Sequence, residues 1–139
     1  MSIKGYLSGD HRRCDELFAE IEADFGEAKR RFGEIAHAYE RHFEIEERIF
    51  FPQFEARSGM ECGPTEIMRK EHAQMRALLE QMKEAIASGD KKRFAAIAET
   101  FVFLTQQHNS KEESILYPMG DRLFGDEANA IVEAMEQAA

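Results

Sequence analysis

The sequence is short of the residues that characterise disulfide-rich, disordered and membrane proteins. It has only two cysteines in 139 residues, too few for a disulfide scaffold. Apolar residues make up 43% of the chain and charged residues 32%, a balance that excludes a disordered chain. No apolar run approaches the ~18 residues that cross a bilayer. These absences predict one globular domain over residues 1–139.

Basic residues are also in the minority. The 18 Lys and Arg against 27 Asp and Glu give a formal net charge of −9, and no basic stripe stands out. Nucleic acid and anionic membranes are therefore poor partners. The first residues, MSIKGYLSGDHRR, lack the charged-then-apolar pattern of a secretory signal. We expect a cytoplasmic protein in which Cys14 and Cys62 stay unpaired.

Strand-like alternation is almost absent, and glycine, proline and capping residues divide the chain into helices. We expect Ser8 and Asp90 to cap helices, Gly26 to break one, and Pro52 and Pro118 to end or kink them. The expected helices cover residues 8–25, 27–52, 64–88 and 90–118, with a short one from about 126. The pattern predicts an all-α fold: an up-down four-helix bundle with a short C-terminal helix.

What the chain does contain is a duplicated motif. HFEIEERIFFP at 42–52 is matched 66 residues later by HNSKEESILYP at 108–118, and DHRRCDELF at 10–18 is matched 61 residues later by EHAQMRALL at 71–79. We interpret the chain as a helical hairpin used twice. Each copy carries a lone His on its first helix and His-x-x-x-Glu on its second.

Helix periodicity places these His and Glu residues on apolar stripes. Residues four apart share a helix face, so His42 lies beside Glu46 and His108 beside Glu112. The four stripes are Leu7, His11, Cys14 and Phe18; Ile35, Tyr39, His42, Glu46 and Ile49; Met68, His72, Met75 and Leu79; and Phe101, Thr105, His108, Glu112 and Ile115. Unpaired carboxylates and imidazoles are costly to bury, and their joint placement favours a metal site over isolated core histidines.

Six residues are thus candidate metal ligands: His11, His42, Glu46, His72, His108 and Glu112. They are too many for one tetrahedral zinc, and mixed nitrogen and oxygen ligands on facing helices suit a pair of iron or manganese ions. We predict two non-haem iron ions, bridged by the two Glu and by an oxo or hydroxo group, with manganese as the alternative. Each ion would keep one open coordination position, where a small molecule can bind.

These motifs resemble the hemerythrin-like His/His/Glu (HHE) cation-binding family, from His11 to Pro118. The resemblance implies a four-helix bundle with a di-iron centre. The family's oxygen carriers have His-x-x-x-His in the third motif, where this chain has His72 and Arg76, and His-x-x-x-x-Asp in the fourth. The ligand set is instead similar to the di-iron domain of iron-centre repair proteins linked to nitric-oxide stress, without their N-terminal cysteine segment. We expect Arg76 to occupy the place of the carriers' additional His.

Two classes of function are open at this point. One is a binding module that takes up nitric oxide, oxygen or peroxide, or releases iron to an acceptor protein under nitrosative or oxidative stress. The other is an enzyme that reduces nitric oxide or peroxide. Reversible oxygen carriage is a further alternative, which we disfavour because two iron ions with like ligands should oxidise rather than release oxygen. We favour the binding and iron-handling class.

Several other residues carry two interpretations each. Cys14 is a redox thiol or a small core residue, and Tyr39 donates a hydrogen bond to a bound molecule or simply packs. The single Glu34-x-x-His37 motif is half of a ferritin-type pair, so we interpret it as structural. The remaining large side chains near the repeated motif are interpreted as core: Phe50, Phe51, Leu116 and Tyr117.

Overall fold

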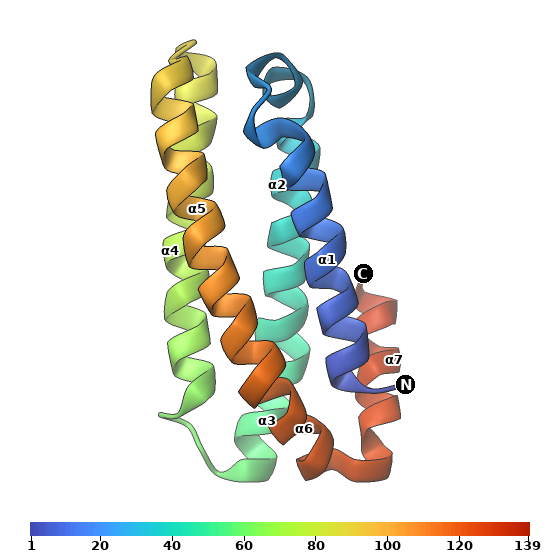
Figure 1. The fold of residues 1–139 in the computed structure, drawn as a ribbon. Helices are drawn as coiled ribbons and strands as arrows, with labels where there is room; N and C mark the ends of the chain where they lie inside the picture. Colours follow the sequence, from blue (N-terminus) through green and yellow to red (C-terminus); the bar gives the residue numbers. More distant parts are fainter.

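Four long helices stand side by side as two antiparallel hairpins in the computed structural model, which describes residues 1–139 (Figure 1). The first hairpin consists of α1 (Ile3–Glu22) and α2 (Phe25–Ile45), and the second of α4 (Pro64–Ala87) and α5 (Lys91–Lys111). The other elements are η1 (Glu46–Phe50), α3 (Phe51–Ser58), η2 (Glu112–Leu116), α6 (Tyr117–Phe124), η3 (Gly125–Glu127) and α7 (Ala128–Ala138). There are no strands, and the predicted all-α bundle with a C-terminal helix is confirmed.

Side-chain caps set where the helices begin. Asp24 and Asp90 accept backbone N–H groups at the starts of α2 and α5, which satisfies donors that have no partner inside the helix. The Asp90 cap was predicted, but Gly26 lies inside α2 rather than breaking a helix. The predicted cap at Ser8 is wrong. Ser2 caps α1, and Ser8 is buried one and a half turns farther along.

The prolines were predicted to end or kink the second and fourth helices, and they do not end them. Each helix passes through a π-helical turn, η1 or η2, and continues as α3 or α6, with Pro52 or Pro118 in the first turn. A proline there loses no helical hydrogen bond. A π turn uses an extra residue per turn, so the side chains beyond it rotate. Ile115, predicted to face inward, is 57% exposed, and Leu116 and Tyr117 are buried instead.

The apolar core lies in two parts, above and below a polar layer. The upper cluster contains 16 buried residues, including Cys14, Phe43 and Met75, and the lower one 14, including Leu7 and Met68. On α1 and α4 the ligand His comes between the two clusters in sequence. α7 closes the lower cluster, lying beside α1 with both chain termini nearby (Figure 1). The polar layer therefore lies across the middle of a well-packed bundle.

Two smaller sequence expectations can also be compared with the structure. Both cysteines are free, with Cys14 buried and Cys62 exposed in the loop between α3 and α4. None of the helices combines the length and the apolar character that a membrane crossing requires.

Candidate metal centre

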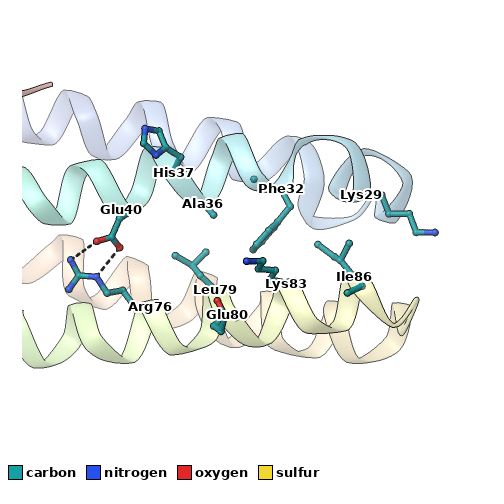
Figure 2. A pocket seen from close by; sticks show the side chains of 12 residues that line it. Lys29, Phe32, Ala36, His37, Glu40, Arg76, Leu79, Glu80, Lys83 and Ile86 are labelled. Atoms are coloured by element: carbon teal, nitrogen blue, oxygen red, sulfur yellow. Dashed lines mark hydrogen bonds and ion pairs between the residues drawn. The ribbon is translucent and has the colours of Figure 1, made fainter.

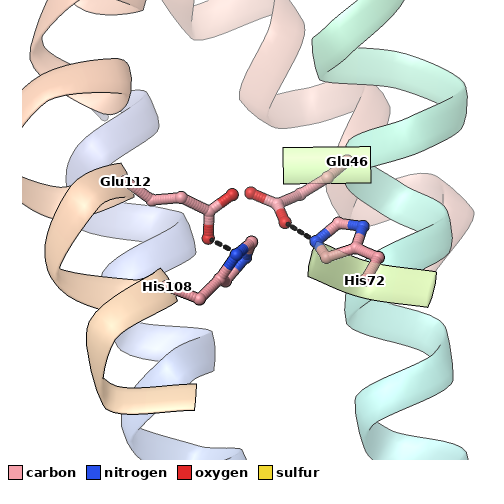
Figure 3. A group of neighbouring side chains, drawn as sticks. All are labelled: Glu46, His72, His108 and Glu112. Atoms are coloured by element: carbon pink, nitrogen blue, oxygen red, sulfur yellow. Dashed lines mark ion pairs between the residues drawn. The ribbon is translucent and has the colours of Figure 1, made fainter. Parts of the chain in front are cut away.

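The six predicted ligand residues converge in the polar layer, and every one is at most 4% exposed: His11, His42, Glu46, His72, His108 and Glu112. Their side chains form two groups in which all ligand atoms lie within 4.8 Å of one another. The first group is Glu46, His72, His108 and Glu112, and the second is His11, His42 and Glu112. Figure 3 shows the carboxylates of Glu46 and Glu112 facing each other from opposite hairpins. Glu112 belongs to both groups and so links them.

Each of the four imidazoles is held from behind by a carboxylate. The Nδ1 atoms of His11, His42, His72 and His108 lie 2.6, 2.7, 2.7 and 2.7 Å from oxygens of Glu113, Asp10, Glu47 and Glu71. An ionised carboxylate only accepts hydrogen bonds, so Nδ1 is the donor in each pair. In a neutral ring this leaves the inward Nε2 with its lone pair free for a metal.

These four acids follow the two-fold repeat of the chain. Asp10 and Glu71 directly precede a ligand His and hold the second His of their own hairpin. Glu47 and Glu113 directly follow a ligand Glu and hold a His of the other hairpin. Sequence analysis gave them no role. The available signal was that the repeat keeps an acid at both places, Asp10 matching Glu71 and Glu47 matching Glu113.

Five inward-facing atoms in this layer have no hydrogen-bond partner: Nε2 of His42, His72 and His108, Oε1 of Glu46 and Oε2 of Glu112. A buried polar atom without a partner costs about 1–3 kcal/mol. Moreover, the ion-pair partners of Glu46 and Glu112 are imidazoles, with no Lys or Arg among them. Imidazole nitrogens and carboxylate oxygens together suit iron or manganese. The residues present therefore fit bound metal cations.

Comparison of the sequence with protein families matches residues 3–120 to the hemerythrin HHE cation-binding domain. The chain belongs to this family. The match covers all six convergent residues, and metal cations are what such domains bind. Comparison with curated proteins finds no match, and comparison with solved structures finds none either.

In the metal-free HHE domain, protons occupy the place of the cation. Burial lowers the pKa of His42 and His108, but the adjacent Glu46 and Glu112 carboxylates outweigh burial and raise both values to about 10. Burial likewise opposes ionisation of Glu46, yet the charge of the adjacent His42 imidazole holds its pKa well below the usual range. Metal binding must therefore displace protons from the imidazoles.

Tyr117 is a buried part of this centre that sequence analysis assigned only to the core. Its hydroxyl lies 2.7 Å from Glu46 Oε2, 2.9 Å from Glu112 Oε1 and 3.0 Å from His11 Nε2. The repeat places Phe51 at the equivalent position, where its ring stacks on His72. The two halves of the HHE site thus differ in the side chain that packs beside the ligand residues. The only feature of the sequence that indicated this asymmetry was the difference between Phe51 and Tyr117 at equivalent positions of the repeat.

Arg76 acts on the centre through Glu47 rather than directly. Its guanidinium donates to both Glu40 and Glu47, and Glu47 also accepts from His72. Arg76 is 31% exposed, so it neither contacts a ligand residue nor turns wholly to solvent. A cavity of about 680 Å³ lies beyond this ion pair between α2 and α4 (Figure 2). It is lined by the exposed His37 and contains none of the six ligand residues.

The structure favours the packing interpretation of both Cys14 and Tyr39. Burial raises the pKa of the Cys14 thiol to about 12, and its Sγ lies 3.6 Å from the Ala38 carbonyl oxygen. Such a thiol is a poor nucleophile at neutral pH. The Tyr39 hydroxyl donates to Asp15 at 2.9 Å, so that proton is already engaged outside the ligand cluster.

Proposed function

We propose that this HHE domain holds two iron ions and uses them to bind or react with small oxidants: nitric oxide, oxygen or peroxide. The observation that carries the proposal is the pair of ligand groups sharing Glu112, with five buried donor atoms left without partners. One ion would be held by His72 and His108 and the other by His11 and His42. Handling such oxidants would serve a cell under nitrosative or oxidative stress.

The bound iron pair would supply electrons and open coordination positions for a small molecule. The chain's own residues position and insulate that pair. The four outer carboxylates fix the imidazoles, and the burial of all six ligands excludes bulk water. The Tyr117 hydroxyl lies between the two ligand carboxylates and offers its proton to Glu46 or Glu112. The two carboxylates are harder ligands than imidazole and favour the ferric state, which argues against reversible oxygen carriage.

Metal content tests the iron sites. The protein from an iron-replete host should contain two irons per chain, and Glu112→Gln should lose at least one because Glu112 belongs to both ligand groups. His37→Ala is the control, since His37 is exposed and outside the cluster. Elemental analysis and the visible spectrum give the readout. Two irons and an unchanged spectrum in Glu112→Gln would refute the shared-ligand assignment.

The reaction itself is tested by adding oxygen, nitric oxide or peroxide to the anaerobically reduced, iron-loaded protein. We expect rapid oxidation by oxygen and peroxide and a distinct nitric oxide spectrum. Following consumption of each reagent in parallel separates binding from turnover. A stable oxygen adduct that forms and releases through repeated cycles would contradict the proposal and indicate an oxygen carrier.

A further inference from the structure

Two neighbouring cavities lead from the surface to the ligand cluster along α1 and α5. The inner cavity is about 10 Å³, room for about one water, and is lined by three of the four ligand histidines. The outer cavity is about 150 Å³ and reaches Ala19 and Gln106, which are exposed. Both are lined by Asp15, Tyr39 and Thr105. These three side chains are the junction between the surface and the metal centre.

Two other approaches to the cluster are blocked. The space below it is filled by Phe51 and Tyr117, both fully buried. The large groove between α2 and α4 ends at the Arg76 ion pairs and is lined by none of the ligands (Figure 2). Access for a small molecule therefore favours the α1 and α5 side.

The junction is narrow because hydrogen bonds tie its walls together. The Asp15 carboxylate on α1 accepts from the Tyr39 hydroxyl on α2 at 2.9 Å and from the Asn109 amide on α5 at 3.1 Å. The Thr105 hydroxyl donates to the sulfur of Met75 at 3.5 Å. Four helices, α1, α2, α4 and α5, thus hold an opening that admits only small molecules.

Apart from the ligand imidazoles, the charged side chains along these cavities are all acidic. Asp15 at the junction and Glu22 in the outer cavity are acidic, and no Lys or Arg lines either cavity. Burial raises the pKa of Asp15 above its usual value, while the hydrogen bond from Tyr39 and the donor amide of Asn109 favour the carboxylate form. Much of the remaining outer wall is apolar, including Phe18 and Phe101, and a charge beside such a wall acts strongly on an ion passing it. An anion meets repulsion here that a neutral molecule does not.

We propose that these cavities are the route by which small molecules reach the metal centre, and that Asp15 makes the route selective for neutral molecules over anions. The inference rests on the proposed function, because a metal must be present for a ligand to bind. Neutral nitric oxide, oxygen and hydrogen peroxide would pass, whereas azide and nitrite would be slowed. Asp15 thereby determines specificity without contacting the metal ligands.

Association rates of azide and nitric oxide test the selectivity. Asp15→Asn removes the charge and can keep both contacts, accepting from Tyr39 and donating to Asn109 once that amide turns. In stopped-flow mixing, azide should bind the oxidised variant about 10-fold faster than wild type, while nitric oxide should bind the reduced variant at a rate within about 2-fold. Added salt should speed azide binding to wild type more than to the variant.

Ala19→Trp tests the route from its exposed mouth, where a large side chain should not disturb folding. We expect about 10-fold slower binding of both probes, with iron content and final spectra unchanged. Ala77→Trp on the exposed face of α4 is the matched control and should bind at wild-type rates. Absence of iron would refute the proposed function. With iron bound, an unaltered azide rate in Asp15→Asn would refute the selectivity, and unaltered rates in Ala19→Trp would refute the route.

Discussion

At the scale of single residues, Tyr117 and Phe51 mark where the two halves of the centre differ. The repeat aligns them, both are fully buried, and both rings lie near a ligand imidazole. Only Tyr117 adds a hydroxyl, and its one proton serves one carboxylate at a time. Because Phe51 shows that the fold accommodates phenylalanine at the equivalent place, replacement of the hydroxyl separates its chemical role from its packing role.

We predict that Tyr117→Phe lowers the free energy of unfolding of the metal-free protein by about 1–3 kcal/mol, because two buried carboxylates lose a donor. Urea denaturation of the metal-free variant measures this loss. Tyr6→Phe is the control, since the Tyr6 hydroxyl makes no hydrogen bond to a side chain in the bundle and its loss should cost under ~0.5 kcal/mol. Equal effects of the two changes would show that the Tyr117 contacts contribute nothing.

The two cysteines should differ sharply in reactivity. Burial raises the pKa of Cys14 to about 12, whereas Cys62 is exposed. A thiol reagent such as DTNB should modify one thiol per native chain at pH 8 and two in denaturant, because the thiolate is the reacting form. Cys62→Ser should abolish the fast reaction. If Cys14 reacted rapidly in native Cys62→Ser, its assignment to the packed core would be wrong.

At the scale of helices, the π turns explain which parts of the site could be predicted. The 3.6-residue period correctly placed His42, Glu46, His108 and Glu112 inward, because each lies before or at the start of a π turn. Within and beyond the turn the period no longer applies, so Ile115 was expected inside, and the contact of the Tyr117 hydroxyl with the ligand carboxylates was missed. Local sequence carries no strong signal for a π turn, since the same residues also suit a regular helix.

Two glycines in helices allow a matched pair of substitutions, one in α6 where it packs against η1 and one on the open face of α2. A Cβ on Gly120 would lie 2.8 Å from Cε1 of the fully buried Phe50 ring, which has no room to move. Gly120→Ala should therefore destabilise the protein by about 1–3 kcal/mol. Gly33→Ala on the open face of α2 meets nothing within 4 Å and should stabilise it by roughly 0.5–1 kcal/mol. Denaturation midpoints of the two variants should move in opposite directions, and a shared direction would contradict the close contact.

At the scale of the whole molecule, the proposed metal ions would join the two hairpins. Each ligand group contains residues from both hairpins, so metal bound in the native state should stabilise the whole bundle. Ferrous iron at about 100 times its dissociation constant should add about 2.7 kcal/mol per site to the free energy of unfolding. Each occupied site should therefore raise the melting temperature by roughly 10 °C.

Thermal unfolding under anaerobic conditions, with and without iron, measures that gain. Glu112→Gln should show a smaller rise, because it removes the ligand common to both groups, whereas His37→Ala should match wild type. Identical melting temperatures for the metal-free and iron-treated wild-type protein would argue against metal binding in the folded state.

The crossed carboxylates have a consequence for how such a chain arose. Each hairpin orients one of its imidazoles with its own acid, Asp10 or Glu71, and relies on Glu113 or Glu47 of the other hairpin for the second. An ancestor of one hairpin would have oriented all its imidazoles only by pairing with an identical copy. Duplication and fusion through the loop at residues 59–63 would then have freed one copy to change. The tyrosine at position 117, opposite the phenylalanine at 51, is a difference that an identical pair was unable to acquire.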